Sequence, residues 1–206
     1  MRTVTAITAQ QKNKKRVNLY LDGEYYCSVE LFTVMSERLK VGSVVDEKRL
    51  SEIIEKSDYT TCLDKATAYI SKSMKTKSQV VKYLLGKGYD KKTIAKVIDK
   101  LIEYGYVDDQ DFVRRYVDEK KSSSGKRKIM YELKIKGVDD KVIDHYDFEG
   151  IDQLDACYSV AQKYLRGKPV DFPTKQKCYR YLISKGFDWD TAKSAVERLE
   201  DESNNS

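Results

Sequence analysis

The sequence predicts a mainly α-helical protein in which three tandem three-helix repeats, helix-turn-helix-like in pattern, follow a small N-terminal module with a β-hairpin. Three observations predict this fold class. A Lys-Gly-apolar-Asp string occurs three times at an interval of 49 residues, apolar residues follow helical spacing from about residue 62 onward, and the first 59 residues alternate apolar with polar side chains instead. A fixed interval of this length is typical of a protein built from repeated supersecondary units.

The repeated string has the residues needed to end one helix and begin the next. Its glycine can adopt the left-handed conformation that closes a helix, and the apolar residue after it can pack against a leucine four positions before the glycine. The aspartate can then accept hydrogen bonds from the free N–H groups of the next helix. We therefore interpret 87–90, 136–139 and 185–188 as corner segments between two helices.

The N-terminal module, residues 1–59, has a different pattern. "RVNLYLDGEYYCSV" alternates apolar and polar residues on both sides of Asp22 and Gly23, which is a strong β-hairpin signal. "TVTAITAQ" is a candidate third strand. We expect two helices after the hairpin, over 30–40 and over 46–57.

Helical periodicity then divides the rest of the chain. The predicted repeats are 60–107, 108–149 and 150–206. In the first of them, helices are expected over 62–73, 76–87 and 90–104. Thr76 and Gln79 fit a capping box at the start of the second helix. A negatively charged tail rich in Ser and Asn, 200–206, is expected to be frayed.

Composition narrows the class of protein. Only two of the 206 residues are proline and 35% are charged, which favours helices. The four cysteines have neither CxxC spacing nor a histidine partner, so we expect reduced core cysteines and neither a zinc site nor a disulfide. The N-terminus lacks an apolar segment, and no run approaches the roughly 18 apolar residues of a membrane span. A cytoplasmic protein is expected.

Charge is concentrated in the middle of the chain. Residues 61–148 carry twenty basic and fourteen acidic side chains, whereas the segments on either side are nearly balanced, so the net charge of +6 lies in this middle segment. Such a concentration is typical of proteins that contact phosphate groups, although a solvated lysine surface is the alternative interpretation. The candidate partner-binding or DNA-binding residues are Lys72, Lys75, Lys77, Arg114, Arg115, Lys121, Lys126, Arg127 and Lys128.

One detail favours a partner over a merely solvated surface. Lysine recurs eleven residues before each repeated glycine, at Lys77, Lys126 and Lys175. These positions lie in the first turn of a predicted helix, where the helix dipole disfavours a cation by roughly a few tenths of a kcal/mol. Local stability does not explain the recurrence, so we expect contact with an anionic partner.

Catalysis finds little support in the sequence. His145 is the only histidine, and no serine or cysteine arrangement marks a nucleophile with its base. "SSSGKR" at 122–127 is superficially similar to a phosphate-binding loop. However, Lys120 stands where that motif requires its first glycine, and Arg127 replaces the Ser or Thr that would hold magnesium.

Three neighbouring carboxylates, Asp108, Asp109 and Asp111, allow two interpretations. They could bind a metal ion. Acidic residues are also stabilised at the start of a helix without any metal, and we favour this second interpretation.

Three segments carry a resemblance to a known family. "GYVDDQDF" at 105–112, "SSSGKRKIMYELKIKGV" at 122–138 and "QKCYRYLISKGFDWDTAKSAV" at 176–196 resemble the bacterial RecX family, whose members regulate the RecA recombinase. The resemblance covers nearly the whole chain. Thr76 and Gln79 depart from the usual serine and glutamate, and Lys75 from a common arginine, but these changes keep the capping and the charge.

The resemblance implies an elongated, curved array that binds along the groove of the RecA–DNA filament. It implies repression of recombinase, strand-exchange and ATPase activities, in recombination, DNA repair and the SOS response. Neither catalysis nor a cofactor is implied, and the family supplies no catalytic residues. We expect a monomer, because the repeats can cover each other's apolar sides, and contact with DNA that is electrostatic and independent of its sequence.

Two alternatives remain. The first is a helix-turn-helix-like DNA-binding regulator without a recombinase partner. Reading helices usually offer Arg, Asn or Gln at their N-termini, whereas here the corresponding helices begin "DKKT", "DDKV" and "DWDT". The second alternative is a purely structural helical adaptor, which would not bind nucleic acid at any salt concentration.

Overall fold

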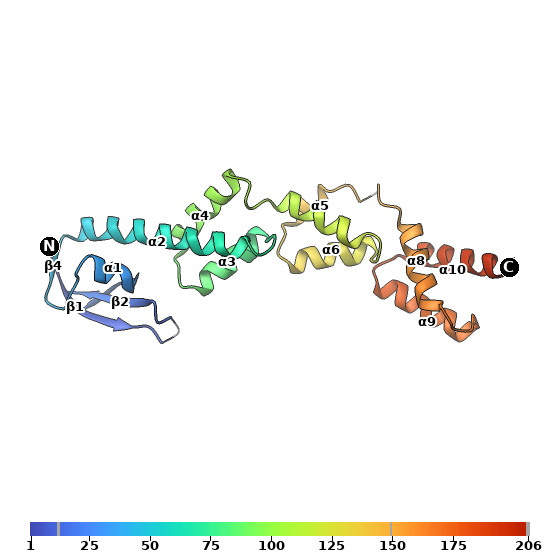
Figure 1. The fold of residues 1–206 in the computed structure, drawn as a ribbon, viewed down its shortest axis with the longest axis horizontal. Coiled ribbons are helices and arrows are strands. Elements are labelled where there is room, and N and C mark those ends of the chain that lie inside the picture. Colours follow the sequence, from blue (N-terminus) through green and yellow to red (C-terminus); the bar gives the residue numbers. More distant parts are fainter. Residues whose placement is uncertain (12, 149, 205–206) are drawn as a thin grey trace. The chain divides into compact units, whose positions relative to one another are not determined.

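A computed structural model describes residues 1–11, 13–148 and 150–204 of the chain. The chain separates into two compact units (Figure 1). The first unit comprises Met1–Lys75 and Gln79–Val107, and the second comprises Thr76–Ser78 and the chain from Asp108 onward.

The first unit joins a small sheet to a set of helices. Its elements are β1 (Arg2–Ala9), β2 (Arg16–Leu21), β3 (Glu24–Glu30), α1 (Leu31–Ser36), β4 (Val44–Val45), α2 (Glu47–Ile70), α4 (Lys91–Glu103) and α3 (Lys77–Gly86), whose first two residues group with the second unit. The strands form one antiparallel sheet in the order β3-β2-β1-β4. Asp22 and Gly23 connect β2 to β3 with φ of 51° and 88°, which confirms the predicted hairpin.

Helix α2 corrects the prediction of two separate helices over 46–57 and 62–73. It runs without a break from Glu47 to Ile70, and its buried side chains recur along it at four-residue intervals. These are Leu50, Ile54, Asp58, Cys62 and Ala66. The first helical repeat therefore shares its first helix with the N-terminal module. Helix α1 is also shorter than predicted, since it ends at Ser36.

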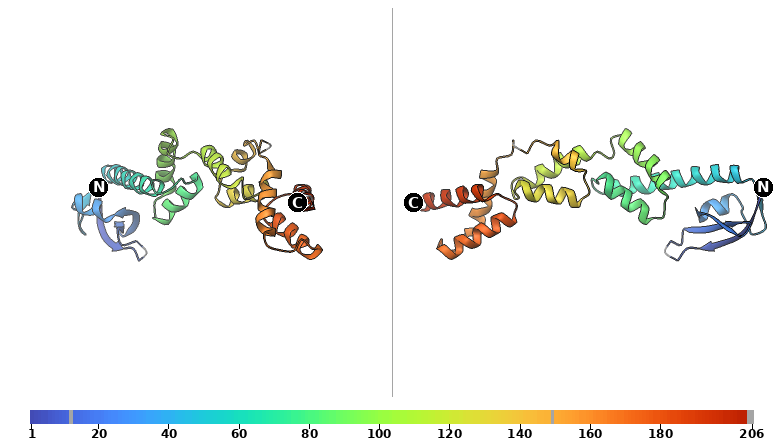
Figure 2. Two further views of the ribbon diagram at one scale, coloured as in Figure 1. Left: turned by 45° about the vertical axis from the view of Figure 1, so that its right-hand side comes forward. Right: turned by 180° about the vertical axis from the view of Figure 1, so that it is seen from behind.

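The second unit is wholly helical. Its elements are α5 (Asp109–Lys120), α6 (Lys126–Ile135), α7 (Asp140–Asp144), α8 (Gln153–Leu165), α9 (Phe172–Ser184) and α10 (Trp189–Asn204). Helices α5 to α7 pack around one core and α8 to α10 around another (Figure 2). We call these groups repeat 2 and repeat 3, and the C-terminal part of α2 with α3 and α4 repeat 1. The mainly α-helical fold with an N-terminal β module is thereby confirmed, whereas the exact repeat boundaries stay predictions.

The end of the chain differs from the prediction. A frayed tail was expected over 200–206, but α10 continues to Asn204, and the last two residues lie outside the described part. The salt bridge between Arg198 Nε and Glu202 Oε1, at 3.3 Å, links successive turns of this helix.

The three corner segments have the predicted backbone geometry. Gly88, Gly137 and Gly186 have φ of 88°, 78° and 89°. The N–H group after each glycine donates to the carbonyl of the leucine four residues before the glycine, at 3.4, 3.2 and 3.3 Å. This hydrogen bond defines a Schellman motif. In the next helix, an aspartate accepts from the first turn, as Asp188 does from Thr191 N at 2.8 Å.

No helix in the described ranges combines the length and the apolar character that crossing a bilayer requires.

Candidate interaction surface

The cations predicted on α5 are exposed but paired. Arg114 and Arg115 are each about two-thirds exposed and share the carboxylate of Asp111, with Arg115 Nε 2.8 Å from Asp111 Oδ2. The hydrogen bond from Arg114, followed by the charges of both arginines, lowers the pKa of Asp111. Just beyond α5, Lys121 Nζ lies 2.7 Å from Asp118 Oδ1. Exposed pairs of this kind contribute little to stability, so a stronger anion can compete for these cations.

The start of α6 carries three of the predicted cations, Lys126, Arg127 and Lys128. Arg127 is exposed, Lys128 is half-buried, and neither forms an ion pair with the residues that the structure describes. Lys126 is half-buried, with its Nζ 5.7 Å from the ring centroid of Phe148. Arg127 and Lys128 therefore present positive charge at the start of α6 without a directly paired carboxylate among the described residues.

The remaining predicted cations lie before or at the start of α3. Lys72 is exposed, and Lys75 Nζ lies 5.1 Å from the ring centroid of Tyr69 in the first unit. Lys77 is exposed and groups with the second unit. The nine predicted residues are thus distributed over both units. Their acting as one binding surface stays a prediction.

The recurring lysines have a partial explanation inside the protein. Lys175 forms an ion pair with Glu200 of α10. The backbone N–H of Lys77 donates to Asp109 Oδ1 at 2.8 Å, which places a carboxylate beside this helix start. An internal carboxylate thus lies beside Lys77 and pairs with Lys175, contrary to the expectation that local structure offers no reason for the recurring lysines.

Tyrosine–lysine stacks are a feature that the sequence analysis missed. In repeat 1 the rings of Tyr69 and Tyr83 stack with centroids 4.1 Å apart, and in repeat 3 those of Tyr164 and Tyr181 do so at 4.7 Å. A corner lysine covers the second ring of each stack, with Lys185 Nζ 5.2 Å from the Tyr181 centroid. A tyrosine four residues before the corner lysine is the available sequence signal. These stacks hold the lysine side chains near their rings.

The carboxylates at the start of α5 serve the helix. Asp108 accepts from Gln110 N and Asp111 N at 2.8 and 3.1 Å, as an N-cap does. Asp109 accepts from Lys77, and Asp111 pairs with the α5 arginines. Within the described ranges, no group of three or more His, Cys, Asp or Glu side chains is placed to hold a metal ion.

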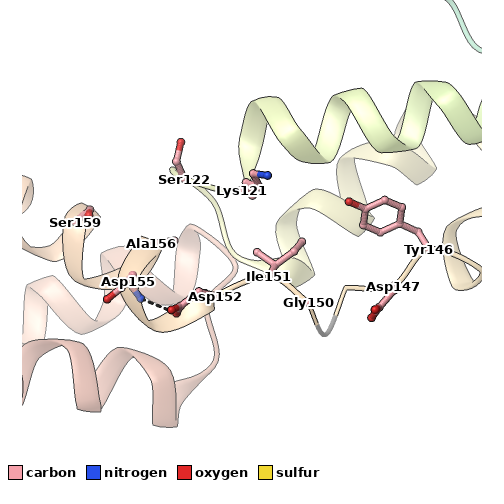
Figure 3. Close-up of a pocket in the computed structure, with 10 residues that line it drawn as sticks. All are labelled: Lys121, Ser122, Tyr146, Asp147, Gly150, Ile151, Asp152, Asp155, Ala156 and Ser159. Carbon is pink, nitrogen blue, oxygen red and sulfur yellow. Dashed lines mark hydrogen bonds between the residues drawn. The ribbon is translucent and has the colours of Figure 1, made fainter.

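A groove of about 480 Å³ lies between the end of α5 and the start of α8 (Figure 3). Its acidic residues also have structural roles. Asp152 caps α8 by accepting from Asp155 N at 3.0 Å, and the Asp155 carboxylate accepts from Arg198 at 3.0 Å. The groove therefore provides no nucleophile–base pair among its described lining residues. His145, at the end of α7, is exposed.

The four cysteines are free thiols in this structure. Cys62, Cys157 and Cys178 are buried, and Cys27 is half-buried. Burial raises the pKa of Cys62 and Cys157 to about 12 and that of Cys27 and Cys178 to about 11. These thiols therefore stay protonated and unreactive at neutral pH.

A buried ionic network links the N-terminal module to repeat 1. Arg16 of β2 is 2% exposed. Its Nη1 and Nη2 lie 3.0 and 2.9 Å from the two carboxylate oxygens of Asp58 in α2, and Nη1 also donates to Glu30 at 3.4 Å. Its Nε and Nη2 donate to the hydroxyl and carbonyl of Ser28 at 2.9 and 2.7 Å. All five N–H donors are thus used, so Arg16 has none left for a ligand.

Fold and surface together define a class: a helical-repeat protein with a small β module, cationic corner regions and no catalytic constellation among its described residues. The sequence matches the RecX N-terminal domain over residues 2–46 and the first, second and third RecX three-helix domains over 62–101, 108–145 and 151–196. These four matches follow the chain order of the module and the repeats.

Relatives and solved structures agree with these matches. A regulatory protein RecX from Clostridium tetani is 38% identical over 203 residues, which cover 95% of this chain and 94% of the relative. Another from Clostridium beijerinckii is 33% identical over 97% of this chain and 96% of the relative. A crystal structure of regulatory protein RecX superposes with a TM-score of 0.64 at 25% identity, covering 96% of this chain and 100% of that one. The chain belongs to the RecX family of regulatory proteins.

Proposed function

We propose that this protein binds the RecA–DNA filament and modulates it, mainly by inhibiting recombinase, strand-exchange and ATPase activities. The observation that carries the proposal is the match of all four parts of the chain, in order, to a family named for regulation. The protein acts by binding, without catalysis or a cofactor. It acts in the cytoplasm as a monomer.

The segment 126–128 is the proposed centre of the contact. Arg127 is exposed and retains its charge, and an exposed arginine can bind a phosphate or a carboxylate with two parallel hydrogen bonds. A filament of recombinase and DNA offers such groups at regular intervals. Contacts to them are electrostatic and do not depend on the base sequence.

The aspartates at the corner segments argue against reading of DNA bases. Asp90 and Asp188 accept hydrogen bonds from the first turn of α4 and from Thr191 at the start of α10. A negative charge held at this end of a helix would repel the DNA backbone. We therefore favour contact through the filament over a sequence-specific DNA regulator.

The test adds the protein to a preformed RecA filament and follows ATP hydrolysis. We expect the wild-type chain to slow hydrolysis. The variant Lys126→Glu, Arg127→Glu, Lys128→Glu should lose inhibitory potency by about tenfold or more, because three charge contacts of about 0.5–1 kcal/mol each are removed.

A matched control reverses three exposed cations of the N-terminal module. The variant Lys40→Glu, Lys48→Glu, Arg49→Glu changes the net charge by the same amount and should keep most of the potency. Circular dichroism should show the same helical content for both variants. Equal loss of potency in the two would remove 126–128 from the contact, and no effect of the wild-type protein on hydrolysis would refute the proposed function.

A further inference from the structure

The start of α6 in repeat 2 lies directly against repeat 3. Gly125, the N-cap residue of α6, donates its N–H to the carbonyl of Lys185 in the third corner segment at 2.8 Å. The next N–H group, that of Lys126, donates to Gln153 Oε1 at the start of α8 at 2.9 Å. Two N–H groups that a helix start leaves unpaired within its own helix are thus satisfied by the following repeat.

Position 125 requires glycine because a side chain has no room there, and not because of the backbone conformation. Its φ of −77° and ψ of 160° are open to any residue. A Cβ atom there would lie 2.3 Å from the carbonyl carbon and oxygen of Gly186 and 2.4 Å from the backbone nitrogen of Phe187. Because these are backbone atoms, no side-chain rotation can relieve the contact. Gly186 is the reciprocal case, since a Cβ on it would lie 2.4 Å from Lys128 N and Cβ.

A comparable pair of contacts occurs about one repeat earlier, among residues of the second unit, with a side-chain hydroxyl in place of the first backbone N–H. Thr76 Oγ1 donates to the carbonyl of Lys136 at 2.7 Å, and Lys77 N donates to Asp109 Oδ1 at 2.8 Å. Thr76 and Lys77 occupy the repeat positions of Gly125 and Lys126. A corner carbonyl and the first residue of the next three-helix group are the acceptors in both cases. Within the second unit, a corner carbonyl thus accepts from the start of a helix in both places, and we call the contacts of Gly125 and Lys126 with Lys185 and Gln153 the joint.

We propose that Gly125 is a positioning residue, because its lack of a side chain lets α6 begin against the third corner segment. This joint holds the cations of 126–128 in a fixed arrangement with Lys185 of repeat 3. The contact of Lys128 with Gly186 places cations from two repeats on adjoining backbone. An anionic surface that binds there meets charge from both repeats at once. This last step rests on the proposed function, whereas the joint itself does not.

The test measures the distance between repeats 2 and 3 by energy transfer. Trp189, at the start of α10, is the only tryptophan of the chain and serves as the donor. A Tyr131→Cys substitution on α6 provides the acceptor site, because Tyr131 is 64% exposed and the native thiols stay protonated at neutral pH. In this background we expect Gly125→Ala to keep the helical content but to shift or broaden the distance distribution. The same variant should inhibit RecA several-fold less well.

The matched control is Gly86→Ala, the same substitution inside α3. A Cβ on Gly86 meets no described atom within 4 Å, so the control should leave the distance and the inhibition unchanged. Should Gly125→Ala fail to fold, Gln153→Ala removes the second contact without adding bulk, and it too should broaden the distribution. An unchanged distribution in the variant that folds overturns the joint. A changed distance distribution with unchanged inhibition overturns the positioning role. A wild-type protein that does not inhibit RecA refutes the proposed function but does not contradict the joint.

Discussion

The capping aspartates of the corner segments make the stability of the following helix depend on pH. Asp188 accepts hydrogen bonds from the backbone N–H and the hydroxyl of Thr191, both at 2.8 Å. The backbone hydrogen bond, the largest influence, lowers the pKa of Asp188 below its ordinary value, and the hydroxyl acts in the same direction against partial burial. The corner aspartates could be predicted from sequence because a cap depends on neighbouring residues alone.

We predict that this cap loses its contribution in acid. The folded-state pKa of Asp188 lies below the unfolded value near 4, so the cap stabilises the protein above about pH 4 and weakens as the pH falls through the folded pKa. Asp188→Asn keeps a capping oxygen that does not titrate. Unfolding in urea at pH 5, 4 and 3 should show the wild type losing stability relative to this variant. Curves that stay parallel over this range would contradict the prediction. Asp190→Asn, in the first turn of α10, serves as the control.

At the scale of elements, α2 shows what local signals miss. Ser57, Asp58, Thr60 and Thr61 lie at the junction of the two predicted helices and are residue types that favour helix ends over helix interiors. Asp58 instead receives Arg16 from β2, 42 residues earlier in the chain, and Thr60 Oγ1 bonds back to the carbonyl of Lys56 at 3.0 Å. Tertiary pairing therefore overrides local preference, and no short-range pattern could have indicated a partner at that distance in the sequence.

We predict that breaking this buried pair strongly destabilises the first unit. Asp58→Ala leaves the Arg16 guanidinium buried with only Glu30 as a counter-ion, at 3.4 Å. Loss of one member of a buried pair costs about 3–5 kcal/mol, and the remaining Glu30 puts the expected loss near 3 kcal/mol. Urea unfolding monitored by circular dichroism measures it.

One helical turn before Asp58, Glu55 provides the control. Glu55 pairs with Lys92 and Lys96 at the surface, where each partner is at least half exposed. Glu55→Ala should therefore cost about 1 kcal/mol or less. Similar losses for the two variants would show that burial does not strengthen the Arg16 pair.

At the scale of the whole molecule, the sequence predicted the repeats and the placement of charge but not how the cations are held. The net charge of +6 and its concentration in residues 61–148 are properties of composition. Which cations stay unpaired depends on the folded neighbours. Arg115 pairs with Asp111, four residues earlier in the same helix, and this spacing is visible in the sequence. The contact of Lys128 with Gly186, in contrast, joins residues 58 positions apart. Spacing within one helix predicts the first pair, whereas a contact between two repeats depends on how their helices pack, which no pattern in this sequence indicates.

The salt dependence of DNA retention provides the last prediction. If unpaired cations bind phosphate groups, retention of single-stranded DNA should weaken steeply as salt rises, because each contact releases a counter-ion. Arg127→Ala with Lys128→Ala should lower the slope of log affinity against log salt by about 1.4, since each contact to a single strand contributes about 0.7.

Lys48→Ala with Arg49→Ala, which removes two exposed cations from the start of α2, should leave the slope unchanged. Parallel lines for all three proteins would exclude Arg127 and Lys128 from the phosphate contact. Absence of retention at every salt concentration would instead favour a helical adaptor, and a strong difference between two DNA sequences would favour a sequence-specific regulator, because phosphate contacts carry no base information.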